Sequence, residues 1–289
     1  SFAGGGSDVS TWFGKNRGKC INAAIDIYAR ANFEVRNDDN FRIKSINTGS
    51  SNLYSREQIF EHDNSDLIIN CLKKFPSLCG INLDIYCDFE PGSGLGGSSS
   101  LCVAVLRGCA KLTGAFLTDF ELQSLAYEVE RIDTTILGGW QDQIASVHGG
   151  LTVTNFDAEG IRTSKLFLSS NDKQILNNSF FLFKVGSSRS SSAIHEKLYT
   201  EKDKSSFTNS MEKVVQVADE VETLIQNRSF EELGTLLDKG WRVKRNISDF
   251  ISNKKVDSLY PKLIHFGADG GRLLGAGGSG FILVFVNIE

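Results

Sequence analysis

A glycine- and serine-rich run between residues 91 and 100 is the segment of this sequence whose residue types are best suited to chemistry. It reads Pro91-Gly92-Ser93-Gly94-Leu95-Gly96-Gly97-Ser98-Ser99-Ser100 and precedes a helical pattern. Because glycine has no Cβ, backbone N–H groups can close around a ligand, and the next helix adds free N–H groups and the positive end of its dipole. The run therefore predicts a phosphate-binding loop whose serine hydroxyls can contact a metal ion or a phosphate oxygen. The first hypothesis is binding of a nucleoside triphosphate.

Two other glycine-loop patterns fit this run less well. Gly92, Gly94 and Gly97 satisfy the dinucleotide pattern G-x-G-x-x-G. That pattern requires a buried parallel strand before the loop and an acid about 20 residues further on, whereas the preceding strand alternates and Asp119 looks like a helix start. No Gly-Lys-Ser/Thr sequence follows, so the Walker A pattern fails. A glycine turn without a ligand is the remaining alternative, and so many glycines would cost it conformational entropy.

Two acidic residues further along the chain could complete a phosphate site. Glu130 continues the apolar face of a helical pattern, where an unpaired carboxylate is costly. A bound Mg²⁺ would offset this cost, and an ion pair with Arg107 or Arg131 would do so equally well. Asp142 follows the glycines of Gly-Gly-Trp-Gln-Asp-Gln and could be held rigidly toward a cleft. The alternative for Asp142 is an ordinary carboxylate in a surface turn.

Two further candidates lie far apart in the sequence, one in a glycine-rich and one in a serine-rich segment. Asp8 follows the glycines at 4–6, where its carboxylate could accept hydrogen bonds from the vicinal hydroxyls of a sugar or could cap a helix. Arg189 lies within a serine-rich segment, and a guanidinium among hydroxyls is suited to clamping a phosphate or carboxylate. A polar surface loop is the alternative for Arg189.

These residues need a scaffold, and the sequence predicts one of mixed type. Apolar and polar residues alternate from 81 to 89, which indicates a half-exposed strand and favours an antiparallel sheet. Thr118 and Glu121 form a capping box that begins a helix. The mixture predicts an α+β protein, with domains at 1–172 and 173–289. Other expected helices cover 68–75, 98–112, 206–226, 230–250 and 254–266, and other expected strands cover 151–156, 180–185 and 281–286; the polar stretch 47–65 is expected to be a loop and a short helix.

Composition excludes some classes of function. The chain has 289 residues, 40% of them hydrophobic and 23% charged, with a formal net charge of −4, so no basic field attracts nucleic acid or anionic lipid. The apolar runs are far shorter than a membrane span. The six cysteines include no Cys-x-x-Cys pair, which favours reduced thiols in a cytoplasmic protein. We therefore expect no nucleic-acid partner and no membrane association.

Three motifs together resemble the GHMP kinase superfamily of small-molecule kinases, and they occur in the order of that family. The first is Phe2-Ala3-Gly4-Gly5-Gly6-Ser7-Asp8, the second is the run from 91 to 100, and the third is Leu274-Gly275-Ala276-Gly277-Gly278-Ser279-Gly280. The first motif and the segment Gly138-Gly139-Trp140-Gln141-Asp142-Gln143 look most similar to the heptose 7-phosphate kinases of that superfamily. Fucokinase-type enzymes share parts of the pattern.

The resemblance implies a two-domain fold with an active site between the domains. It implies transfer of the γ-phosphoryl group of ATP, with Mg²⁺, to the anomeric hydroxyl of a heptose 7-phosphate, which would supply nucleotide-activated heptose synthesis. The partner is then a small phosphorylated sugar, and a homodimer is compatible with the resemblance. Another sugar 1-kinase, of fucokinase or galacturonokinase type, and a non-catalytic ATP- and sugar-binding sensor are the alternatives.

The resemblance also implies roles for individual residues. Residues 91 to 99 would bind ATP, Ser98 and Glu130 would hold Mg²⁺, and Asp142 would act on the acceptor hydroxyl as a base or as its orienter. We assign the 7-phosphate of the substrate to Arg189 as our own inference. The other expected substrate-binding residues are Gly5, Gly6, Asp8, Gln141, Gly277 and Gly278.

Overall fold

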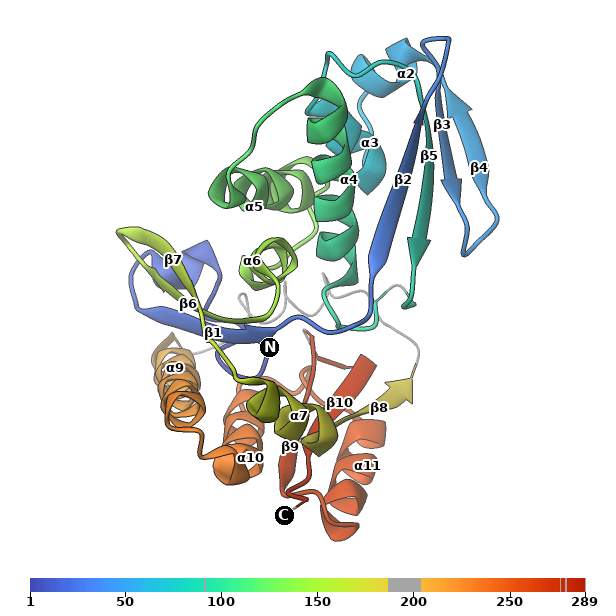
Figure 1. The fold of residues 1–289 in the computed structure, drawn as a ribbon. Helices are drawn as coiled ribbons and strands as arrows, with labels where there is room; N and C mark the ends of the chain where they lie inside the picture. Colours follow the sequence, from blue (N-terminus) through green and yellow to red (C-terminus); the bar gives the residue numbers. More distant parts are fainter. Residues whose placement is uncertain (91, 187–203, 276, 279, 289) are drawn as a thin grey trace.

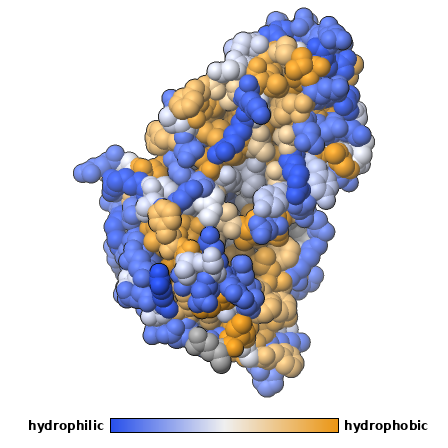
Figure 2. Space-filling model, in the orientation of Figure 1, coloured by the Kyte–Doolittle hydropathy of each residue, from blue (hydrophilic) through white to orange (hydrophobic). Residues whose placement is uncertain are grey.

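The computed structural model describes residues 1–90, 92–186, 204–275, 277–278 and 280–288, and in them two lobes meet at a small central sheet (Figure 1). The upper lobe in Figure 1 holds the sheet β2–β5 and helices α2 to α5, and the lower lobe holds β8 to β10 with α7 and α9 to α11. Seen as a surface, the molecule is hollowed between the two lobes (Figure 2). This mixture of antiparallel strands and packed helices confirms the predicted α+β class.

The upper lobe is a four-stranded sheet covered on one face by helices. The strands run in the order β2 (Ala29–Val35), β5 (Ile81–Cys87), β3 (Phe41–Ser45) and β4 (Ser51–Tyr54), with β3 parallel to β5 and the other pairs antiparallel. The alternation along β5 buries Ile81 and Leu83 against the helix residues Val105 and Leu106. This packing fixes the end of β5, which leads into the glycine run. The helices are α2 (Arg56–Phe60), α3 (Leu67–Lys73), α4 (Gly97–Thr113) and α5 (Asp119–Tyr127).

The central sheet joins the two lobes. Its antiparallel strands are β1 (Gly18–Ala23), β6 (Leu151–Asp157) and β7 (Gly160–Lys165), with the short helix α1 (Ser10–Phe13) before them. Helix α6 (Gln141–His148) lies above this sheet in Figure 1, and α9 (Lys204–Asn227) lies below it. Ile21 and Val153 of this sheet share a hydrophobic cluster with Val217 and Val221 of α9.

The boundary between two domains that the sequence predicted at residue 172 stays a prediction.

The lower lobe is a three-stranded antiparallel sheet with helices packed around it. The order is β8 (Phe180–Gly186), β10 (Gly280–Phe285) and β9 (Gly270–Leu273), and α10 (Leu233–Arg245) packs against β9. Trp241 and Tyr260 meet Leu273 and Ile282 in its core. The remaining elements are α7 (Ser170–Ser179), α11 (Lys254–His265) and a 3₁₀ turn, η2 (Phe230–Glu232).

The structure differs from the sequence-based expectations at several elements. The polar stretch 47–65 contains strand β4 as well as the expected short helix α2, so the loop expected there was partly wrong. Strands β3, β7 and β9 and helices α6 and α7 were not anticipated. The capping box of Thr118 and Glu121 is confirmed, but α5 continues as a π-helix, η1 (Glu128–Asp133). Within the described ranges, every helix is too short or too polar to span a bilayer.

A buried lysine ties the central sheet to the lower lobe. Lys19 of β1 is only 9% exposed, and its Nζ lies 2.7 Å from Asp219 Oδ1 and 2.5 Å from Glu222 Oε2, both on α9. Its backbone N–H donates to the hydroxyl of Ser7, which in turn donates to the carbonyl oxygens of Gly4 and Lys19. One residue therefore connects the first glycine motif, the central sheet and α9.

We expect Lys19→Met to lower the free energy of unfolding by about 2–3 kcal/mol, because it leaves Glu222 without its cation and Asp219 with only the exposed Arg17. Their partial exposure keeps this loss below that of a fully buried pair. Arg17→Met is the matched control, because Arg17 also pairs with Asp219 but is 55% exposed, and its loss should cost less than about 1 kcal/mol. Urea unfolding measures both. Equal losses for the two variants would contradict this account of the junction.

Candidate active site

The glycine run forms a loop that opens helix α4 without a side-chain cap. Gly92, Gly94 and Gly96 all have positive φ (73°, 76° and 74°), a conformation that other residues adopt only with strain. Gly96 is the N-cap of α4, and no side chain caps the helix there. The N–H of Ser100 donates to Gly96 O, so the N–H groups of residues 97–99 have no acceptor within the helix. These groups are available to an anion. Pro91 lies outside the described residues.

The third glycine motif, from the lower lobe, lies directly against this loop. A methyl group built on Gly94 would lie 3.1 Å from the carbonyl oxygen of Leu274, and one built on Gly280 would lie 2.5 Å from that of Ser93. Only backbone without side chains can approach so closely. The loop is therefore enclosed by both lobes, as the resemblance implied.

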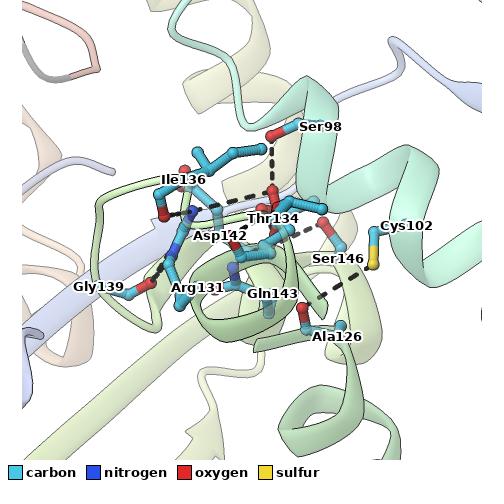
Figure 3. Close-up of polar contacts among 12 residues, drawn as sticks. Ser98, Cys102, Ala126, Arg131, Thr134, Ile136, Gly139, Asp142, Gln143 and Ser146 are labelled. Atoms are coloured by element: carbon cyan, nitrogen blue, oxygen red, sulfur yellow. Dashed lines mark hydrogen bonds and ion pairs between the residues drawn. The ribbon is translucent and has the colours of Figure 1, made fainter. Parts of the chain in front are cut away.

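Glu130 is the centre of a polar network, and Figure 3 labels three of the residues around it, Ser98, Arg131 and Gln143. Its side chain is 0% exposed. Ser98 donates to Oε1 at 2.6 Å, and Ser99 and Gln143 both donate to Oε2 at 2.5 Å. Arg131 Nη1 lies 3.9 Å from Oε1, so the ion-pair alternative is present only as a long contact. The predicted burial of this carboxylate is confirmed, and three helical segments meet at it.

The Ser98–Glu130 pair fits a magnesium ion. Mg²⁺ prefers oxygen ligands and is commonly held by one or two protein oxygens together with phosphate oxygens. Glu130 supplies a carboxylate, and the exposed Ser98 supplies a hydroxyl that joins it to the loop. Among the described residues no group of three or more acidic, histidine or cysteine side chains could hold a metal on its own. A metal in this site would therefore depend on a bound phosphate for the rest of its ligands.

Asp142 lies in the first turn of α6 and faces the glycine loop. A methyl group built on Gly96 would lie 3.4 Å from its Cγ and 3.5 Å from its Oδ1. Loss of hydration raises the pKa of the Asp142 carboxyl above its ordinary value, and the charges of Asp8 and Glu130 act in the same direction. The side chain is half-buried, so a ligand can still reach it. Sequence reasoning placed this residue correctly beside the loop.

Asp8 is buried and holds the start of α6. It is 1% exposed. Its Oδ1 accepts the N–H of Gly6 at 2.9 Å, and its Oδ2 accepts the N–H of Gln141 at 3.0 Å. The capping alternative expected for Asp8 is therefore present, but the helix that it caps, α6, is distant in sequence. A contact with sugar hydroxyls stays a prediction.

Gln141 borders the same space from the other side. A methyl group built on Gly5 would lie 3.1 Å from Gln141 Oε1, and this oxygen is buried with no hydrogen-bond partner in the described part of the chain. Asn22 Nδ2 donates to Gln141 O at 3.0 Å, which fixes the backbone. The preceding residue, Trp140, stacks on Tyr127 with ring centroids 3.7 Å apart. A buried amide oxygen without a donor is suited to accept from a ligand hydroxyl.

The remaining predicted residues are brought in less directly. The N–H of Gly278 donates to Ile251 O, and its carbonyl oxygen accepts from the side-chain amide of Asn253. Gly277 packs against Ile251, because a methyl group built on it would lie 2.8 Å from Ile251 Cα. These two glycines shape the third motif, and any contact with a ligand stays a prediction. Arg189 lies outside the described residues.

Two cations and a pocket also lie at this site, and the sequence analysis assigned no role to them. Lys244 of α10 and Arg272 of β9 lie within electrostatic reach of Asp8, Asp142 or Cys20. A pocket of about 180 Å³ opens beside the glycine loop. The sequence does contain a hint of this pocket, because apolar residues lie at the second glycine motif (Phe89 and Leu95) and directly after the third (Phe281). Its lining comprises Ile27, Asp88, Phe89, Glu90, Ser93, Leu95, Lys184, Gly186, Gly280 and Phe281.

Comparison with known proteins assigns this geometry to a family. Residues 66–150 match the N-terminal domain of GHMP kinases. In an alignment of 294 positions the chain is 30% identical to a Campylobacter jejuni protein named D-glycero-alpha-D-manno-heptose 7-phosphate kinase. The alignment covers 99% of this chain and 86% of the other. The chain belongs to the GHMP kinases, as its three motifs indicated.

Solved structures agree on the fold. A structure described as a D-glycero-D-manno-heptose 1-phosphate kinase from Bacteroides thetaiotaomicron superposes with a TM-score of 0.81 at 24% identity, covering 99% of this chain and 85% of that chain. A putative sugar kinase from Campylobacter jejuni gives a TM-score of 0.76 at 26% identity, covering 99% and 84%. The arrangement of lobes and sheets described above is therefore that of the family.

We expect Gly96→Ala to reduce turnover by about 100-fold, because the new methyl group occupies the gap between the loop and the Asp142 carboxylate and misplaces the reacting groups. Gly49→Ala is the matched control: Gly49 has nearly the same φ of 72°, with nothing within 4 Å of the added methyl group. Both variants should lose about 1–2 kcal/mol of stability from backbone strain. Steady-state kinetics and thermal unfolding separate the two effects. If both variants kept normal turnover, Gly96 would not face the reaction.

Proposed function

We propose that this GHMP kinase transfers the γ-phosphoryl group of ATP to the anomeric hydroxyl of a heptose 7-phosphate, giving the 1,7-bisphosphate. One observation carries the proposal: the uncapped start of α4, the Ser98–Glu130 pair and the Asp142 carboxylate all lie at the same loop. Phosphoryl transfer needs little more than positioning and charge stabilisation. The identity to a protein named as a heptose 7-phosphate kinase supports the choice of sugar.

ATP fits the site with its phosphates on the loop and its base in the adjoining pocket. The free N–H groups of residues 97–99 and the dipole of α4 stabilise negative charge on the phosphates. The pocket is lined in part by Ser93 and Leu95 of the loop, and its residues Phe89, Leu95 and Phe281 offer apolar contacts to a purine ring.

Ser98 and Glu130 would hold Mg²⁺, which neutralises charge on the β- and γ-phosphates when bound. The rest of the network keeps these two residues in place. Ser99 and Gln143 occupy the second oxygen of Glu130, so its first oxygen is the one directed at Ser98 and the loop. Arg131 donates to the carbonyl oxygens of Ile136 and Gly139 and thereby shapes the turn before Asp142.

Asp142 would accept the proton of the anomeric hydroxyl or orient that hydroxyl toward the γ-phosphorus. Its carboxylate faces Gly96 of the loop, so an acceptor oxygen between them would point at the phosphates. A raised pKa makes the Asp142 carboxylate a better proton acceptor than an ordinary aspartate carboxylate. An anomeric hydroxyl is more acidic than other sugar hydroxyls, so little basicity is needed.

The sugar would lie between the first and third glycine motifs. Gly5, Gly6, Asp8 and Gln141 would line one side, and Gly277 and Gly278 would shape the other. The assignment of Arg189 to the 7-phosphate, the cytoplasmic location and a homodimer stay predictions. Another sugar 1-kinase and a non-catalytic sensor are the alternatives to this function.

A substrate panel tests the proposal. We expect ATP consumption with D-glycero-D-manno-heptose 7-phosphate to exceed that with free heptose, fucose, galactose and galacturonate, and phosphorus NMR to show the new phosphate at the anomeric carbon. A preference for an unphosphorylated sugar would favour the fucokinase-type alternative. Nucleotide binding without turnover on any sugar would favour the sensor.

We expect Asp142→Asn to reduce kcat by about 10²–10⁴-fold, the usual contribution of general-base help, with little change in ATP affinity. The wild-type enzyme should lose activity as the pH falls through the raised pKa of Asp142, because protonation removes the acceptor, and the variant should lack that acidic limb. Asp119→Asn is the control, because Asp119 also lies in the first turn of a helix but is exposed. Unchanged turnover in Asp142→Asn would remove this residue from the chemistry.

A further inference from the structure

Two basic side chains of the lower lobe border the site and have no role in the function described so far. Lys244 lies in the last turn of α10 and is half-buried, with its Nζ 3.4 Å from Gly275 O of the third glycine motif. Arg272 lies in β9 and is 5% exposed. Its Nη1 donates to Phe2 O at 2.8 Å, and its Nε is buried without a hydrogen-bond partner among the described residues.

Lys244 and Arg272 belong to elements that pack against each other, α10 and β9. Within the described ranges neither forms an ion pair with an acid, whereas the residues flanking Lys244 on α10 do: Arg242 pairs with Asp238, and Arg245 pairs with Asp257. Burial lowers the pKa of Lys244 to about 8, with the charge of Arg272 as the next cause. Burial also lowers the pKa of Arg272 to about 10. Two positive charges that are shielded from water and have no acidic partner are stabilised when an anion binds near both.

The site is polarised from one lobe to the other. Asp8 and Asp142 attract Lys244 electrostatically, but neither reaches it as an ion-pair partner in the part of the chain that the structure describes. The acids lie with the first glycine motif and α6, and the cations lie with α10 and β9. A molecule with a hydroxyl at one end and a phosphate at the other matches this arrangement, because each end meets the groups that suit it.

We propose that Lys244 and Arg272 form a phosphate-binding pair, with Lys244 contacting the phosphate and Arg272 supplying a fixed second charge behind it. This inference rests on the proposed sugar-phosphate kinase function. Lys244 has a flexible stem and three donors, while Arg272 is held in place by Phe2 O. For the acceptor phosphate this pair is an alternative to Arg189, whose assignment stays a prediction.

Two phosphates can reach this side of the site. One is the phosphate that the acceptor carries, and the other is the γ-phosphoryl group in transfer, because Gly275 lies against Gly94 of the glycine loop. The chemistry of binding is the same for both. Only the kinetics with phosphorylated and unphosphorylated acceptors distinguish them.

The test compares Lys244→Met with Arg245→Met, using D-glycero-D-manno-heptose 7-phosphate and the same heptose without its phosphate. Arg245 is the adjacent residue, is 46% exposed and pairs with Asp257 at 3.0 Å, so its loss should leave both substrates unaffected. Loss of a hydrogen bond to a charged group typically reduces binding by about 10–100-fold. If Lys244 holds the acceptor phosphate, KM for the phosphorylated sugar rises by that factor and the kinetics with free heptose do not change.

If Lys244 instead holds the transferred group, kcat falls by a similar factor with both acceptors and KM changes little. Lys244→Arg, which keeps the charge, should restore part of the loss in either case. Thermal stabilisation by inorganic phosphate gives a readout independent of turnover: it should be smaller in Lys244→Met than in Arg245→Met. If Lys244→Met matches Arg245→Met in both kinetics and stabilisation, the phosphate site is wrong. If wild-type enzyme is inactive on every sugar while phosphate stabilisation still depends on Lys244, the proposed function fails and the phosphate site stands.

Discussion

The burial of one carboxylate organises this site. Glu130 is fully buried. A buried carboxylate without hydrogen-bond partners would destabilise the fold by roughly 1–3 kcal/mol or more. The chain satisfies it from three directions: Ser98 and Ser99 at the start of α4, Gln143 in the first turn of α6, and Arg131 beside it on η1. The same contacts that solvate Glu130 therefore bring the glycine loop next to the helix that carries Asp142. The placement of the glycine loop beside Asp142 therefore follows from the need to satisfy the buried Glu130 carboxylate.

The lower lobe completes what this network begins. Its third glycine motif lies against the loop at Gly94, where side chains would not fit, and its basic residue Lys244 is attracted by the acids of the first motif and α6. Lys19 holds the lobes together through α9. Substrate groups of opposite chemical character can thus be held at opposite sides of one site. This division of labour is consistent with a kinase whose acceptor carries its own phosphate.

Much of this was readable from the sequence where the signal is local. The glycine run, the capping box at Thr118 and the burial of Glu130 depend on neighbouring residues, and the structure confirms each of them. What could not be read depends on long-range packing. Asp8 looked like a sugar ligand or the cap of its own helix, yet it caps α6 across more than a hundred residues. Lys244 lies within Arg-Val-Lys-Arg at a helix end, which reads as ordinary complementarity to the helix dipole. Arg242 pairs with Asp238 four residues before it on the same helix, but only tertiary contacts show that Arg245 is paired and that Lys244 is not. The short strands β3, β7 and β9 were missed because their residues gain strand character mainly from their partners.

Anomalous diffraction from crystals grown with Mn²⁺ and a non-hydrolysable ATP analogue tests the central claim most directly. The account predicts one ion held by a Glu130 carboxylate oxygen and the Ser98 hydroxyl, at roughly the 2.0–2.2 Å expected of such a site, with the γ-phosphate between the start of α4 and the Asp142 carboxylate. An ion held elsewhere, with Glu130 still enclosed by its serine and glutamine partners, would show that this carboxylate serves the fold alone and would contradict the account.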